Sequence, residues 1–188
     1  MKSKPNTGKE KLRKEIFLPD DLDARIDGQA IVLKAKDGEV KRVFKQKNIS
    51  LKMEGKKIIL ESGKGTKEDK KLMGSMIAHL KNMIRGGQQK HAYVLKICSG
   101  HFPMNVGISN GRLTVKNFLG EKVPRILNLK QGADVKVEGD LIHVASTNKE
   151  VAGQISADIE QLTRRPGFDT RIFQDGIYII NKDGKELK

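Results

Sequence analysis

The stretch Met53-Glu54-Gly55-Lys56-Lys57-Ile58 recurs later in the chain as Val137-Glu138-Gly139-Asp140-Leu141-Ile142. In both places apolar residues alternate with polar ones on either side of a Glu-Gly turn, which is typical of a β-hairpin with one buried face. A hairpin repeated together with its surroundings indicates that one structural unit occurs twice.

The correspondence extends along the chain in both directions with only small changes of offset. Turn glycines and strand valines agree before the hairpin, and one face of a helix agrees after it. The matching pairs are Gly28/Gly111, Val32/Val115, Gly38/Gly120, Gly74/Gly153, Met76/Ile155, Ala78/Ala157, Leu80/Ile159 and Met83/Leu162. We interpret this as an internal duplication, the alternative being a chance agreement of common residues.

Each copy contains one helix signal. Residues 66–69 resemble a capping box, and apolar residues then recur at helical spacing until Gly86-Gly87. The second helix is predicted to start at the capping box of residues 147–150 and to end before Pro166-Gly167. Between these signals the sequence predicts an antiparallel meander over about residues 30–62. Short strands are predicted at residues 93–97, 106–108, 113–115, 123–127, 135–137, 141–144 and 177–179.

These patterns predict an α+β protein of two tandem duplicated small domains, each an antiparallel sheet packed on one helix. We expect the first repeat over residues 15–87 and the second over residues 88–188 with its C-terminal tail. Residues 1–14 hold six Lys and Arg and almost nothing apolar, which predicts a flexible basic N-terminal arm. Structure is expected to begin near Ile16.

Composition narrows the class of protein. Of the 188 residues, 37 are Lys or Arg and 23 are Asp or Glu, giving a formal net charge of +14, which favours a polyanionic partner. No window approaches a membrane-spanning length, and neither a secretory signal nor a basic amphipathic helix with large apolar residues is present. The single cysteine, Cys98, forbids an intramolecular disulfide and agrees with a reducing interior. We expect a cytoplasmic protein without a membrane partner.

The sequence offers little for catalysis. Cys98 and His101 form one C-x-x-H pair, but no second pair completes a zinc site. Residues 62–66 lack the spacing of a phosphate loop. We therefore expect no enzymatic activity, no cofactor, no metal and no small-molecule substrate; the competing hypothesis is an RNA-modifying enzyme that uses Cys98 and His101, with a concave pocket joining them.

Nucleic-acid binding fits the charge better. Residues 1–88 hold 22 basic and 12 acidic residues, and residues 89–188 hold 15 and 11. Six Phe, two Tyr and no Trp disfavour an open platform on which single-stranded bases stack. Recognition of the backbone and shape of folded RNA is more compatible with this composition.

Three separated motifs, together with the first helix segment over residues 73–84, resemble a known family. They are His101-Phe102-Pro103-Met104, Asn117-Phe118-Leu119-Gly120-Glu121-Lys122 and Phe173-Gln174-Asp175-Gly176-Ile177-Tyr178. In this order they resemble the archaeal and eukaryotic branch of a universal large-subunit ribosomal protein, number six in bacterial and nine in eukaryotic naming. The resemblance covers about residues 13–182.

The resemblance implies a non-enzymatic structural component of the large ribosomal subunit, in the cytoplasm. It implies binding to large-subunit rRNA near the sarcin–ricin stem and the factor-binding region, beside neighbouring large-subunit proteins. It also implies that the second domain is the main RNA anchor of the protein, although the first half carries the greater excess of positive charge. The implied rRNA-binding residues are Arg164, Arg165, Arg171, Gln174, Lys182, Asn117 and Lys122.

Two alternatives remain open at this point. The protein could be a free-standing RNA-binding or RNA-chaperone module, which a stoichiometric place in the large subunit would exclude. The motif residues could also serve packing instead of contact, because Phe118 and Leu119 adjoin a predicted hairpin glycine and Asp175-Gly176 reads as a turn.

Overall fold

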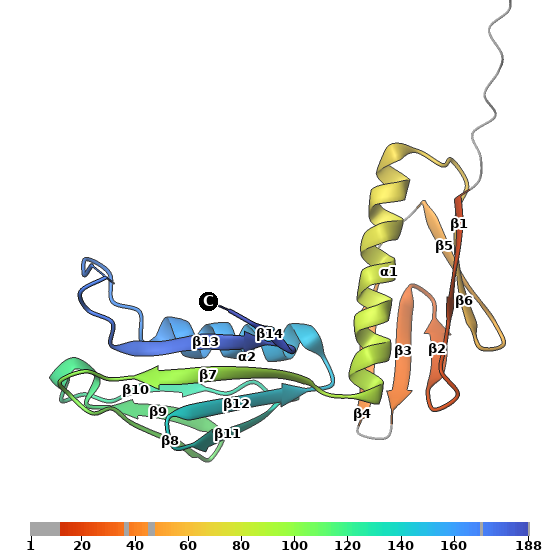
Figure 1. The fold of residues 1–188 in the computed structure, drawn as a ribbon. Coiled ribbons are helices and arrows are strands. Elements are labelled where there is room, and N and C mark those ends of the chain that lie inside the picture. Colours follow the sequence, from red (N-terminus) through yellow and green to blue (C-terminus); the bar gives the residue numbers. More distant parts are fainter. Residues whose placement is uncertain (1–11, 36–37, 45–47, 170, 188) are drawn as a thin grey trace, which may run out of the picture. The chain divides into compact units, whose positions relative to one another are not determined.

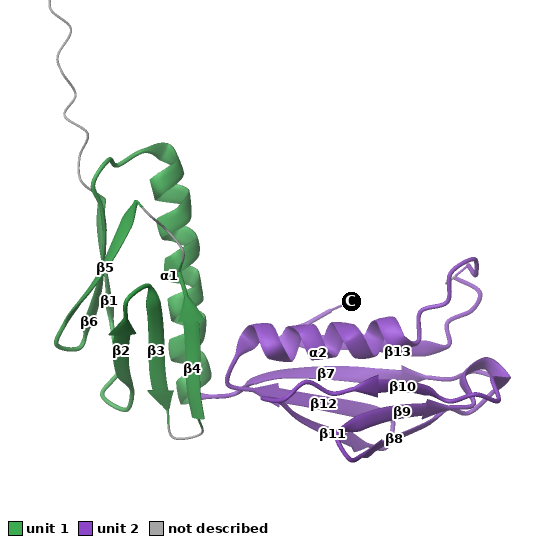
Figure 2. Cartoon of the chain, turned by 180° about the vertical axis from the view of Figure 1, so that it is seen from behind, with its two compact units in different colours: residues 1–88 green, residues 89–188 purple. Residues whose placement is uncertain are grey.

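The computed structural model describes residues 12–35, 38–44, 48–169 and 171–187 of the chain. They belong to two compact units, residues 1–88 (unit 1) and residues 89–188 (unit 2), drawn in different colours in Figure 2. Each unit has its own hydrophobic core between its helix and its sheets.

Unit 1 contains six strands and then one helix. They are β1 (Leu12–Phe17), β2 (Asp23–Asp27), β3 (Ala30–Ala35), β4 (Gly38–Val43), β5 (Ile49–Glu54), β6 (Lys57–Ser62) and α1 (Lys67–Gln88) (Figure 1). All strand pairs are antiparallel and form two three-stranded sheets, with orders β1-β6-β5 and β2-β3-β4. Helix α1 buries Met73, Met76, Leu80 and Met83 at the expected helical spacing.

Unit 2 repeats this order and adds to it. Its elements are β7 (His91–Cys98), β8 (Asn105–Ser109), β9 (Arg112–Lys116), the 3-10 turn η1 (Phe118–Gly120), β10 (Arg125–Asn128), β11 (Asp134–Glu138), β12 (Leu141–Ser146), α2 (Lys149–Leu162), β13 (Gly176–Lys182) and β14 (Lys185–Glu186). One sheet has the order β10-β9-β8 and the other β11-β12-β7-β13-β14. The first matches β2-β3-β4, and the β7-β12-β11 part of the second matches β1-β6-β5.

The predicted fold class is confirmed: the chain is α+β, with two tandem units of antiparallel sheet and one helix each. The paired turn glycines have a physical reason. Gly55 lies between β5 and β6 with φ of +60°, and Gly139 lies between β11 and β12 with φ of +59°. Side chains rarely tolerate this left-handed conformation, so glycine occupies both turns.

The strands of each unit are divided between two sheets, which the sequence did not indicate. The expected meander ends at β4, and β5 pairs with β6 and not with β4. Strand β2 was not predicted, and Gly120, expected to be a hairpin glycine like Gly38, ends η1 within a longer β9–β10 connection.

The N-terminal boundary also differs from the prediction. Residues 1–11 of the expected arm lie outside the described residues, but β1 begins at Leu12, before the expected start near Ile16. Arg13 of this strand has partners on the exposed face. It lies 3.0 Å from Glu15 and 3.9 Å from Glu61 of β6, so a basic residue that suggested an arm forms ion pairs within a sheet.

Both helix starts are capped by side chains. Thr66 Oγ1 accepts a hydrogen bond from the Asp69 backbone N–H (3.2 Å), and the Asp69 carboxylate accepts one from the Thr66 N–H (3.1 Å), which confirms the first capping box. At α2 the cap is Asn148, one residue later than predicted, and its Oδ1 accepts from the Glu150 N–H at 2.9 Å. No helix in the described parts of the chain is both long and apolar enough to cross a membrane.

Candidate nucleic-acid interface

Three connections meet at one end of unit 2: residues 99–104 between β7 and β8, residues 117–124 between β9 and β10, and residues 163–175 between α2 and β13 (Figure 1). The Gly100 N–H donates to the Asp175 carboxylate, and Asn117 Nδ2 donates to the Pro103 carbonyl at 3.1 Å. These contacts join the three family-like motifs into one surface, which we call the loop end.

Arg125, at the start of β10, links the 117–124 loop to the C-terminal end of α2. Its Nε and Nη2 donate to the Glu121 carboxylate at 2.8 and 2.6 Å, and its Nη1 donates to the Leu162 carbonyl at 2.7 Å. The guanidinium also lies over the Phe118 ring, 4.4 Å from its centroid. Phe118 itself is only 1% exposed, so this motif residue serves packing.

The hydrogen bonds from Arg125 lower the pKa of Glu121, and they outweigh its burial, which acts in the opposite direction. A carboxylate with a lowered pKa stabilises the folded state above its unfolded pKa, near 4.3, and this stabilisation disappears as the pH falls through the folded pKa. We therefore expect Glu121→Gln to unfold at lower urea concentration than the wild type at pH 7. The difference should shrink as the pH falls through the folded-state pKa of Glu121, and a difference that stays undiminished at the lowest pH where both proteins still fold would contradict the ion-pair explanation.

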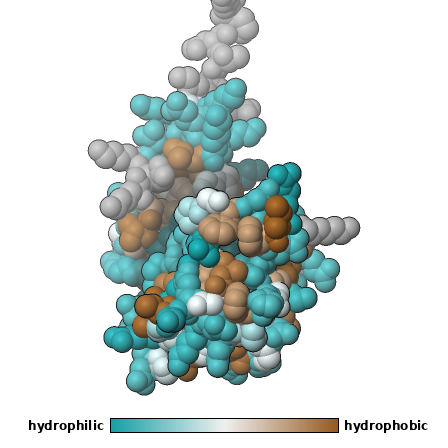
Figure 3. All heavy atoms as spheres, turned by 90° about the vertical axis from the view of Figure 1, so that its left-hand side faces the viewer, coloured by the Kyte–Doolittle hydropathy of each residue, from teal (hydrophilic) through white to brown (hydrophobic). Residues whose placement is uncertain are grey.

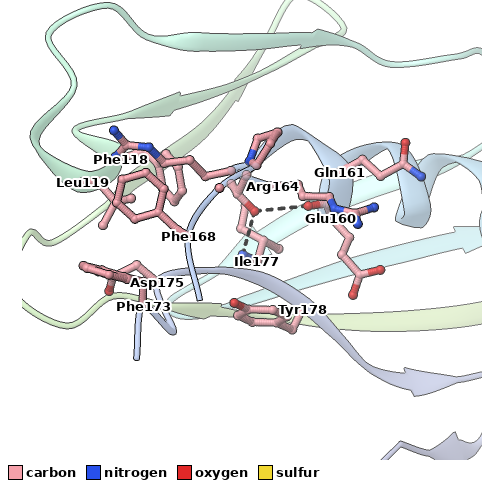
Figure 4. A pocket seen from close by; sticks show the side chains of 14 residues that line it. Phe118, Leu119, Glu160, Gln161, Arg164, Phe168, Phe173, Asp175, Ile177 and Tyr178 are labelled. Atoms are coloured by element: carbon pink, nitrogen blue, oxygen red, sulfur yellow. Dashed lines mark hydrogen bonds between the residues drawn. The ribbon is translucent and has the colours of Figure 1, made fainter. Parts of the chain in front are cut away.

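A cavity of about 460 Å³ opens at the loop end (Figure 4). Its wall includes Phe118, Leu119, Arg164, Arg165, Phe168 and Phe173. Thr163, at the end of α2, holds the start of the 163–175 segment: its hydroxyl donates to the Glu160 carbonyl (3.2 Å) and accepts from the Ile177 N–H (2.9 Å), as the dashed lines show. The segment is thereby fixed to both α2 and β13.

Four of the predicted site residues lie on this segment. Arg164 and Arg165 are exposed beside the cavity, and the Arg165 guanidinium stands over the Phe168 ring at 4.0 Å. The Arg171 side chain is 88% exposed and pairs with Asp169 at 2.8 Å, an ion pair that lowers the pKa of Asp169 and raises that of Arg171. Gln174 is also exposed, and its Nε2 lies 3.5 Å from the Arg171 carbonyl.

The other three predicted residues divide between two places. Asn117 precedes η1 in a left-handed conformation (φ +60°), and Lys122 is exposed in the same connection, so both belong to the loop end. Lys182 does not: it is the last residue of β13, six residues beyond Gly176, or about 20 Å along the strand. The structure therefore brings six of the seven predicted residues together and separates Lys182.

Sequence reasoning missed two features of this surface. The first is Arg125, whose only local signal is Glu121 four residues earlier. The second is a gathering of exposed apolar side chains at the loop end, visible as brown atoms in Figure 3. They are Phe102, Val123, Phe168, Ile172 and Phe173. The low aromatic count did not reveal them, because the three exposed Phe residues of the loop end lie in two loops that only the fold brings together.

The residues of the enzymatic alternative take no part in the cavity. Neither Cys98, at the end of β7, nor His101 is among its lining residues. Among the residues that the structure describes, no group of three or more His, Cys, Asp and Glu side chains could hold a metal ion.

A cationic loop surface with exposed aromatic rings, on a chain of formal net charge +14, is typical of the class of nucleic-acid-binding proteins. The sequence profile of the family described as Ribosomal protein L6 matches residues 18–90. "Large ribosomal subunit protein uL6" of Methanococcus vannielii is 41% identical over 176 residues, 94% of this chain and 97% of its own. The proteins of the same name from Methanothrix thermoacetophila and Haloarcula marismortui are 38% and 34% identical over 92% of this chain, covering 98% and 97% of their own lengths.

The chain therefore belongs to the ribosomal protein L6 family, in its archaeal branch. This confirms the resemblance inferred from the three motifs. The family consists of structural, non-enzymatic proteins of the large ribosomal subunit, and its place is the cytoplasmic ribosome.

Proposed function

We propose that the protein binds large-subunit rRNA through the loop end of unit 2, near the sarcin–ricin stem and the factor-binding region. The observation that carries this proposal is the convergence of three separated loops, one of which carries Arg164, Arg165 and Arg171 together with exposed phenylalanines. The residues proposed to contact rRNA at this end are Arg164, Arg165, Arg171, Gln174, Asn117 and Lys122.

The chemistry of these side chains suits a folded RNA. Arginine presents a planar fork of donors that matches phosphate, and its flat face also stacks on rings. Arg165 is held over Phe168, which in turn meets Phe173 edge to face at 5.0 Å. An unstacked base at a bulge or loop of the RNA can extend this stack, while the neighbouring arginines bind phosphates.

Two parts of the chain are assigned to other contacts. Lys182, at the opposite end of β13, is proposed to contact a separate RNA segment or a neighbouring large-subunit protein. The larger charge excess of residues 1–88 supports affinity for rRNA without defining a second ordered site. Neighbouring large-subunit proteins are the remaining partners that we propose.

The test compares a large-subunit RNA fragment carrying the sarcin–ricin stem with an unrelated duplex of equal length, over a series of salt concentrations. Contacts to phosphate alone weaken steeply with salt for both RNAs. We expect preference for the cognate fragment to survive at high salt. Equal affinity for both RNAs at every salt concentration would contradict the proposed location and favour a general RNA chaperone.

A further inference from the structure

The two copies differ at the strand that begins each of them. In unit 2, β7 lies between β12 and β13 (Figure 1). In unit 1, β1 pairs with β6 on one side, and no described strand pairs with its other side. The duplication therefore contains one filled strand position and one open one.

Each residue of β1 can be matched with one residue of β7 in the other copy. Leu12 of β1 lies opposite Ser62, and His91 of β7 lies opposite the matching Ser146. Beyond the strands the same hydrogen bond recurs, from the Leu18 N–H to the Lys56 carbonyl and from the Ile97 N–H to the Asp140 carbonyl, both at 2.8 Å. Leu18 thus corresponds to Ile97, which lies opposite Ile177 of β13.

The outer edge of β1 carries the backbone groups that a further strand needs. Successive N–H groups of a strand point to opposite sides, and Leu18 donates toward β6. Arg13, Glu15 and Phe17 therefore direct their N–H groups away from β6. The Phe17 side chain is 66% exposed, and the Lys57 ammonium lies 4.8 Å from the centroid of its ring.

A groove runs beside this edge, between β1 and α1. It encloses about 650 Å³ and is lined by Lys14, Ile16, Ile77, Lys81, Ile84 and Arg85 among others. At the corresponding place in unit 2, Ile177 and Ile179 of β13 are buried between β7 and α2, with Ile177 fully inaccessible. Unit 2 thus shows what fits this groove: an extended segment with an apolar residue at every second position.

We propose that β1 and this groove bind an extended segment of another protein, which adds an antiparallel strand to the β1-β6-β5 sheet. The segment places alternate apolar residues against Ile16, Ile77 and Ile84. It carries acidic residues near Lys14 and Lys81. An apolar floor beside a strand edge suits such a segment better than an RNA backbone, which would leave the strand's N–H and C=O ladder without partners.

Photo-crosslinking in purified large subunits tests the kind of partner. The protein would carry benzoylphenylalanine in place of Phe17, since this side chain is exposed at the edge, and the linked fragment would be identified by mass spectrometry. We expect one short segment of a neighbouring protein with alternating apolar and acidic residues. Crosslinks to rRNA, or no crosslink, would overturn the proposal.

A pair of variants tests the mode of binding. Glu15→Pro removes one outward N–H while leaving the bonds to β6, whereas Glu15→Thr loses the same carboxylate but keeps the N–H. We expect the proline variant to reduce the crosslink yield about tenfold relative to the threonine variant, the effect of losing a backbone hydrogen bond and its neighbours. Equal yields would overturn strand addition.

The same variants separate this proposal from the rRNA site. Glu15 lies in unit 1, so Glu15→Thr and Glu15→Pro should bind the sarcin–ricin fragment as the wild type does. If Glu15→Pro fails to fold, amide hydrogen exchange in wild-type subunits decides instead. The Arg13, Glu15 and Phe17 amides should exchange at least about tenfold more slowly in the subunit than in the free protein, and unchanged exchange would refute the inference.

Discussion

The double variant Arg164→Ala/Arg165→Ala is expected to bind the sarcin–ricin fragment about 30- to 800-fold more weakly at moderate salt than the wild type. Each substitution removes one charge-assisted contact between an arginine and a phosphate, and such a contact contributes about 1 to 2 kcal/mol in an exposed site. Because two phosphates are no longer neutralised, the slope of log affinity against log salt should also fall by about 1.4 to 1.8. Fluorescence anisotropy over a salt series measures both quantities.

The matched control for this variant is Arg112→Ala/Lys136→Ala. Both side chains are exposed, Arg112 at the start of β9 and Lys136 on β11, so the control removes the same net charge from the same unit, outside the loop end. We expect the control to lose affinity only slightly and equally for cognate and unrelated RNA. If both double variants weaken binding to the same extent, long-range charge explains the affinity and the loop end is not the contact.

Phe118→Ala is expected to lower the free energy of unfolding of unit 2 by about 3 to 5 kcal/mol, the range observed when a buried phenylalanine is truncated. Phe118 is 1% exposed and packs into the core of unit 2. Its loss also leaves the Arg125 guanidinium without the ring beneath it. Urea unfolding, followed by amide exchange in unit 2, measures the effect.

Phe102→Ala is the control for this truncation. Phe102 lies at the same loop end and contacts Gly120, but it is 41% exposed. Truncating it should cost well under half as much, because little cavity remains behind an exposed ring. A loss below about 1 kcal/mol for Phe118→Ala would show that Phe118 is not a core residue despite its burial.

Local signals in the sequence predicted most of the fold. The two helices, the Glu-Gly hairpins and the duplication depend on residues close together in the chain. These predictions are confirmed except at two helix ends: the second cap lies one residue later, and α1 continues through Gly86-Gly87 to Gln88. Strand β2 and the start of β1 depend on pairing with distant partners. Leu12–Phe17 looks like a basic arm until Glu61 and Lys57 of β6 lie opposite it. Composition within one segment cannot supply that information.

The candidate site shows the same limit. Arg164, Arg165 and Arg171 were visible because they cluster in one segment. Arg125 was not, because its role arises from the Leu162 carbonyl, 37 positions away, and from the ring of Phe118. The resemblance grouped Lys182 with the arginines, although β13 carries it to the other end of the unit.

The late position of β13 has a consequence for how the protein is made. His91, at the start of β7, is buried and lies 3.0 Å from the carboxylate of Asp183, 92 positions later, just beyond β13. The described strand pairs of unit 1 all lie within residues 12–62 and can form once Ser62 has been synthesised. The second edge of β7 is covered only by β13, which is synthesised near the end of the chain. Unit 1 can therefore fold while the protein is still being translated. A nascent chain that stops before residue 176 would leave β7 with an exposed edge, the usual starting point for aggregation.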